Sequence, residues 1–115
     1  MNDLSIREKI SVLLEKASSL KYSEPQQTIK FSKKALLLSE KIGYTFGEKV
    51  AQSYMAYSYH SIGNDEKALD LIYISLDYFI KEGFCDLIWW GYNLLGIIFH
   101  ELNDIEKSMD FFDKA

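Results

Sequence analysis

The amino-acid sequence repeats itself with a period of about 40 residues, and this constrains the fold more than any other feature. Shifting the sequence by 40 positions aligns residues of the same kind: Gly43 with Gly83, Met55 with Leu95, Ala56 with Gly96, Tyr59 with Phe99, His60 with His100, and Lys67 with Lys107. Two positions can be followed three times, through Thr28, Ala68 and Ser108 and through Ala35, Ser75 and Ala115. A fixed period of this length is typical of stacked supersecondary units. We therefore predict one domain of three units, at about 5–43, 44–83 and 84–115.

Each unit is predicted to contain two helices, because capping and breaking residues occur at half the period and the apolar residues between them recur every three or four positions. One proline and six glycines in 115 residues are too few to separate the many short strands of an all-β domain. The predicted fold class is therefore all-α, with about six antiparallel helices. Their N-terminal residues are predicted at Ser5, Ser23, Thr45, Asn64, Asp86 and Asn103.

The predicted helix ends rest on two local signals. Four of the predicted N-terminal residues are followed three positions later by Glu or Gln, which is the spacing of a capping box: Ser5 with Glu8, Ser23 with Gln26, Thr45 with Glu48 and Asn103 with Glu106. Glycine favours the left-handed conformation that ends many helices. We therefore expect Gly43, Gly63 and Gly83 to lie just after the second, third and fourth helices.

The small and aromatic residues of the second and third units resemble those of tetratricopeptide repeats (TPR). The matching residues are Ala56, Tyr59, Ala68, Ile72 and Ser75 in the second unit, and Gly96, Phe99, Ser108, Phe112 and Ala115 in the third. The resemblance implies a right-handed α-α superhelix, or solenoid. The family's early tryptophan is replaced by Gln52 and Tyr92, and the period exceeds the usual length. This longer period resembles the N-terminal TPR segments of bacterial signalling proteins, such as diguanylate cyclases of the GGDEF type and histidine kinases.

The resemblance implies a non-catalytic module that binds a protein or peptide, forming the regulatory or sensory N-terminal segment of a longer bacterial signal transduction protein. Two alternatives stay open, a peptide-sensing regulator domain and a purely structural dimerisation module. Carried over by position, the partner-binding groove is expected to comprise Ser53, Tyr57, His60, Trp90, Asn93, Ile97 and His100.

Composition excludes several other functions. The formal net charge is −4, with +3 on residues 1–49 and −7 on residues 50–115, which argues against binding to nucleic acid or to an anionic membrane. The longest apolar runs are far shorter than the ~20 residues that span a bilayer. No catalytic motif, metal-binding motif or cofactor motif is recognised, so we expect no enzyme activity, no metal and no cofactor. The single cysteine, Cys85, suits a reducing compartment, and we expect a cytoplasmic protein.

The last predicted helix carries several apolar residues, including Met109, Phe111 and Phe112. Terminal repeats need a polar outer face for solubility, and no such helix follows in this sequence. We therefore expect the C-terminal helix pair to bury this face against a second copy and form a homodimer.

Overall fold

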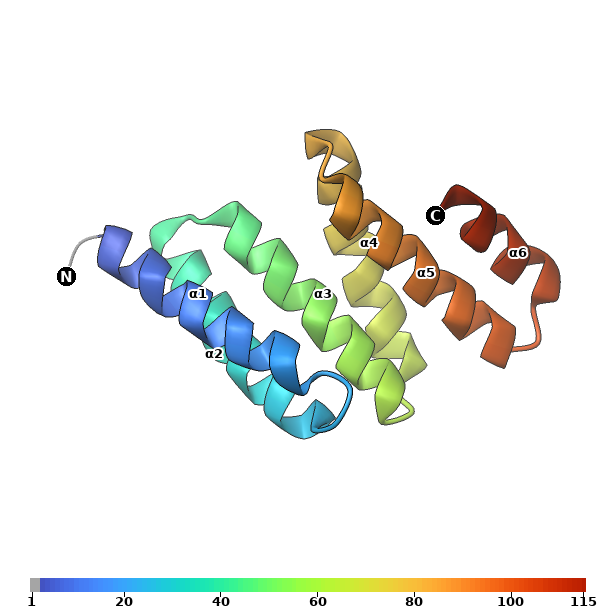
Figure 1. Ribbon diagram of the computed structural model, residues 1–115, viewed down its shortest axis with the longest axis horizontal. Helices are drawn as coiled ribbons and strands as arrows, with labels where there is room; N and C mark the ends of the chain where they lie inside the picture. The colour runs from blue at the N-terminus through green and yellow to red at the C-terminus, as the bar shows by residue number, and fades with distance from the viewer. Residues whose placement is uncertain (1–2) are drawn as a thin grey trace.

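Six α-helices follow one another along the chain in the computed structural model, which describes residues 3–115, with side chains from residue 5 onwards. The helices are α1 (Asp3–Leu20), α2 (Pro25–Ile42), α3 (Thr45–Ser61), α4 (Asp65–Glu82), α5 (Cys85–Glu101) and α6 (Ile105–Lys114) (Figure 1). No strand occurs within these residues. The predicted all-α fold of six helices is confirmed, and the predicted boundaries differ from the observed ones by only a few residues.

Each helix packs against the next one in the chain, so that pairs α1–α2, α3–α4 and α5–α6 lie in a row (Figure 1). The odd-numbered helices also approach one another, because α1 contacts α3 and α3 contacts α5. The described part of the chain measures 49 × 29 × 20 Å along its principal axes. None of the described helices has the length and apolarity that crossing a membrane would require.

The two helices of a unit approach each other closely at the small residues that the repeat predicted. In the first unit, the Thr28 hydroxyl donates a 2.9 Å hydrogen bond to the carbonyl oxygen of Ala17. In the second unit, the small residues Ala56 and Ala68 are fully buried and belong to one core cluster. Large side chains would hold the helix backbones apart, so small residues here are a condition of the packing.

The core consists of apolar side chains between the helix pairs. The buried side chains of α3, α4 and α5 form one continuous cluster, which includes Met55, Ile72, Leu76, Leu94 and Ile98. A smaller cluster around Ile10, Ala35 and Ala51 joins α1, α2 and α3. Because each helix pair shares its apolar surface with the next pair, no unit could bury its core alone.

The joints between successive units have nearly the same backbone conformation. Gly43 and Gly83 are left-handed, with φ/ψ of 67°/29° and 77°/31°. The residues that follow them, Tyr44 and Phe84, have φ/ψ of −89°/84° and −81°/83°. Glycine is favoured at such positive φ because it lacks a Cβ. The predicted roles of these two glycines are therefore confirmed, and Gly63 is left-handed as well, with φ of 88°.

The turns inside the units show which capping predictions were right. Asn64 caps α4 as predicted, because its side chain accepts a hydrogen bond from the backbone N–H of Lys67. Asn103 does not cap α6, because it takes the left-handed conformation, with φ of 63°, that Gly63 takes one repeat earlier. The cap of α6 is Asp104, whose carboxylate accepts from the N–H of Lys107.

The other three predicted capping boxes are wrong. Ser5 lies inside α1. Glu24, and not Ser23, is the N-cap of α2, because Pro25 occupies the first helical position. Tyr44, and not Thr45, is the N-cap of α3, because the chain enters that helix directly after the left-handed Gly43.

Candidate functional site

A groove of about 340 Å³ runs between α1, α3 and the start of α5. Its apolar lining comes from all three helices, with Leu14 on α1, Tyr54 on α3 and Leu87 on α5. The polar lining comes from α1 alone and consists of Ser11, Glu15 and Ser18. The remaining lining residues are Phe46 and Val50. The groove is thus an apolar channel whose polar groups lie on its α1 wall.

Four aromatic side chains extend this surface from the loop after α1 across α3 to α5, and we call them the aromatic cluster: Tyr22, Tyr54, Tyr57 and Trp90. Tyr57 is at its centre, with its ring centroid 5.2 Å from that of Tyr22 and 5.9 Å from that of Trp90. The Tyr54 ring lies 6.2 Å from Trp90 in an edge-to-face arrangement. Such contacts fix the rings without covering them completely, because Tyr22 is 70% exposed and the other three are half-buried.

The Tyr57 phenol is neutral at ordinary pH. Burial, and to a smaller extent the neighbouring Tyr22 phenol, raise the pKa of Tyr57 above its ordinary value. Its hydroxyl therefore keeps a proton to donate to a partner.

The Lys21 side chain lies against the aromatic cluster at the α1 end. Its ammonium group is 4.7 Å from the ring centroid of Tyr22 and 6.0 Å from that of Tyr54. It also donates to the carbonyl oxygen and to the hydroxyl of Ser18, each at 3.0 Å. The cluster thus already holds one cation supplied by the chain itself.

The predicted groove residues are only partly brought together. Tyr57 and Trp90 meet in the aromatic cluster, as just described. Ser53 is fully buried and its hydroxyl donates to the carbonyl oxygen of Val50 at 2.7 Å. The Ser53 side chain is therefore not accessible to a partner in this structure.

Three further predicted groove residues, Asn93, Ile97 and His100, lie on α5. Asn93 uses its amide N–H to donate to the carbonyl oxygen of Trp89 at 2.8 Å. Ile97 is 39% exposed and His100 is exposed at the end of the helix. These side chains are accessible in part, and they extend along α5 beyond the aromatic cluster.

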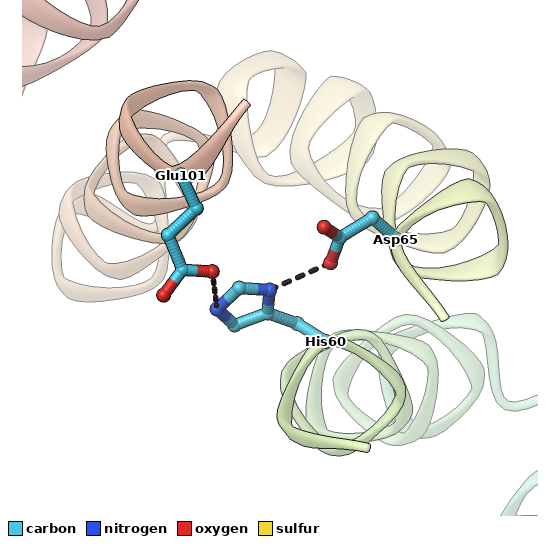
Figure 2. Close-up of side chains that lie close together, drawn as sticks. All are labelled: His60, Asp65 and Glu101. Carbon is cyan, nitrogen blue, oxygen red and sulfur yellow. Dashed lines mark hydrogen bonds and ion pairs between the residues drawn. The ribbon is translucent and has the colours of Figure 1, made fainter. Parts of the chain in front are cut away.

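His60 takes part in a second constellation, formed with Asp65 and Glu101 (Figure 2). Its Nδ1 is 2.7 Å from Oδ1 of Asp65 and its Nε2 is 3.2 Å from Oε2 of Glu101. Only the protonated imidazole can donate from both nitrogens. The ring therefore links the end of α3 to the start of α4 and to the end of α5. His60 is thus engaged within the chain, whereas His100 is exposed at the end of α5.

The constellation does not recur in the third unit. The repeat aligns His100 with His60, but it aligns Ile105 with Asp65. His100 therefore lacks the carboxylate that holds Nδ1 of His60. Sequence reasoning paired the two histidines and missed their difference, although the change from Asp to Ile five residues after each histidine was the available signal.

The donor atoms of His60, Asp65 and Glu101 lie within 4.8 Å of one another, and nitrogen with carboxylate oxygen is a donor set that suits first-row divalent metals. Each ring nitrogen faces a different carboxylate (Figure 2). An ion on Nε2 would therefore share Glu101 and leave Asp65 to hold the Nδ1 hydrogen. A protonated imidazole would donate to both carboxylates without an ion.

Comparison of the chain with family models, with curated proteins and with solved structures finds no match.

Proposed function

We propose that the chain is a non-catalytic TPR-like module that binds a protein segment or peptide in the groove between α1, α3 and α5. The observation that carries this proposal is the continuity of the groove with the aromatic cluster. Together they form one accessible apolar surface to which three different helices contribute.

The chemistry of this surface is that of a docking site. Tyr and Trp are enriched among the residues that dominate binding energy, because they offer large rigid contact areas together with a polar group. Tyr57 and Trp90 supply such anchors, and the hydroxyls of Ser11 and Ser18 supply hydrogen-bonding groups on the α1 wall of the groove. This composition favours an extended or helical peptide that inserts apolar side chains.

The TPR assignment is supported by the 40-residue period and by the close helix contacts at small residues. In that family the first helices of successive units line the concave face, and here the corresponding helices α1, α3 and α5 line the groove. A right-handed superhelix, a cytoplasmic location and a role as the N-terminal segment of a bacterial signalling protein, such as a GGDEF-type diguanylate cyclase, belong to this proposal.

Selection from a phage-displayed library of random 12-residue peptides tests the function. The immobilised chain is expected to enrich a family of related peptides. A Tyr57→Ala/Trp90→Ala variant should lose binding to the resynthesised peptides while its circular dichroism stays helical. The matched control is Trp89→Ala, because Trp89 is the adjacent residue on α5 and is 57% exposed. Equal binding by the double variant and the parent would exclude this groove as the interface.

A second function, homodimerisation through the C-terminal helix pair, is favoured by a separate observation. Four large apolar side chains of α6 and the turn before it are substantially exposed, with the following fractions: Leu102 51%, Ile105 49%, Met109 59% and Phe112 41%. Neighbouring exposed apolar side chains are typical of interaction surfaces. This surface is separate from the groove, so that dimerisation and peptide binding are compatible.

A further inference from the structure

We propose that the segment bound in the groove carries a Lys or Arg side chain next to an apolar side chain, and that Glu15 pairs with this cation. The inference rests on the proposed peptide-binding function and specifies the chemistry of its ligand. It is carried by the charges that line the groove.

Glu15 is the acidic group of the groove. Its exposed carboxylate lies on the α1 wall beside Leu14, opposite apolar side chains of α3 and α5. Among residues 5–115 no ion pair or hydrogen bond joins the Glu15 side chain to another group. An unpaired carboxylate at the edge of an apolar channel favours a ligand that brings both a cation and an apolar group.

Lys21 is the basic group at this surface, and its charge is already satisfied. Its ammonium group donates twice to Ser18 and lies over the rings of Tyr22 and Tyr54. The arrangement shows that the aromatic cluster accommodates a cation on its ring faces, as expected from the negative potential of those faces. A ligand cation would therefore find both an unpaired carboxylate and cation-accepting rings along one groove.

The overall charge distribution favours the same ligand. The chain carries a formal net charge of −4, made up of +3 on residues 1–49, which include α1, and −7 on residues 50–115, which form most of α3 and all of α4, α5 and α6. A negative potential attracts basic segments and repels acidic ones. It therefore raises both the association rate and the affinity of a basic ligand.

The sequences of the selected phage peptides provide the first test. We expect enrichment of Lys or Arg adjacent to Leu, Phe, Tyr or Trp. For the tightest peptide, resynthesised with a fluorescent label, replacing this Lys or Arg by norleucine should weaken binding about tenfold at low salt, as for the loss of one charge-assisted contact. The effect should shrink at high salt because of screening.

Variants of the chain test whether the Lys or Arg of the peptide pairs with Glu15. Glu15→Gln should weaken the basic peptide about tenfold but leave the norleucine peptide unchanged. Glu40→Gln removes the same charge from α2, outside the groove, and should change neither affinity. Lys21→Gln removes the competing cation next to the ligand and should tighten the basic peptide by a few-fold.

The outcomes separate this inference from the proposed function. Enriched peptides that need Tyr57 and Trp90 but show no basic residue, or bind the Glu15→Gln variant equally well, would overturn the cation inference and leave peptide binding in place. Failure to enrich any peptide would count against both. If two copies of the chain were found in contact through the groove, a second copy and not a basic peptide would be its occupant.

Discussion

The hydroxyl of Ser108 donates a 2.7 Å hydrogen bond to the carbonyl oxygen of Gly96, which joins the two helices of the third unit. Thr28 makes the same contact in the first unit, to Ala17. The contact thus recurs in both outer units even though the residues involved differ, and the small side chains at these positions fix the spacing of each helix pair.

Ala68 occupies the position of Ser108 in the second unit and is fully buried. Ala68→Leu is expected to destabilise the chain by about 1–3 kcal/mol, because the larger side chain has no space at the helix contact. Thermal unfolding followed by circular dichroism measures the effect. The matched control is Ala68→Ser, which reproduces the residue of the third unit and should be tolerated. Equal melting temperatures for the Leu variant and the parent would show that the contact is not close.

Gly96 is expected to be required for the docking of α6. A Cβ added at this position would lie 2.6 Å from the ring of Phe112, so Gly96→Ala should push that ring away and destabilise the fold by about 1–2 kcal/mol. Hydrogen exchange of the α6 amides reports the loss directly. Phe112→Leu in the same chain should recover part of it, since the smaller side chain leaves room for the methyl group. Exchange in the double variant that is no slower than in Gly96→Ala would contradict this explanation.

Replacing His60 should weaken the connection between the second and third units. His60→Gln removes the imidazole whose two nitrogens face Asp65 and Glu101 and is expected to cost about 1–2 kcal/mol, a range lowered by the 58% exposure of the Glu101 side chain. His100→Gln is the repeat-matched control and should be nearly neutral. Urea unfolding of the two variants makes the comparison, and equal losses would indicate that the ion pairs contribute nothing specific.

The exposed apolar side chains of α6 are expected to drive self-association. Sedimentation velocity over a range of concentrations should show a dimer that Met109→Glu converts to a monomer, because Met109 is 59% exposed and a carboxylate there would be buried at an interface without a partner. Ile62→Glu, at an exposed apolar residue of the turn after α3, is the control. A parent chain that stays monomeric at all concentrations would rule out this interface.

The sequence predicted the helix pairs well because their signals are local and repeated. Gly43 and Gly83 end their helices as expected, since a positive φ strongly favours glycine. Capping boxes were less informative: Thr45 and Glu48 have the required spacing, yet Thr45 is already inside α3. A pattern of two polar residues occurs within helices as well as at their ends, so it locates a boundary only approximately.

Only the part of the candidate site that lies at repeat positions of the second and third units was predicted from the sequence. Tyr57 and Trp90 were identified by their positions in successive units, and they do meet. The wall supplied by α1 was missed, although Leu14 lies one period before Tyr54 and both line the groove. The pairing of His60 with Glu101 was also missed. It depends on how α5 is positioned along α3 in the packed structure, and no local sequence pattern encodes that position.

The near identity of the joints at Gly43–Tyr44 and Gly83–Phe84 makes the array extensible. A further 40-residue copy inserted between Gly83 and Phe84 would begin and end with the backbone conformations already present, so its neighbours would need no new turn. Such a duplication would lengthen the groove by the width of one helix pair and add new side chains to its wall. Ligand length could therefore evolve by gene duplication, independently of the residues that recognise each ligand side chain.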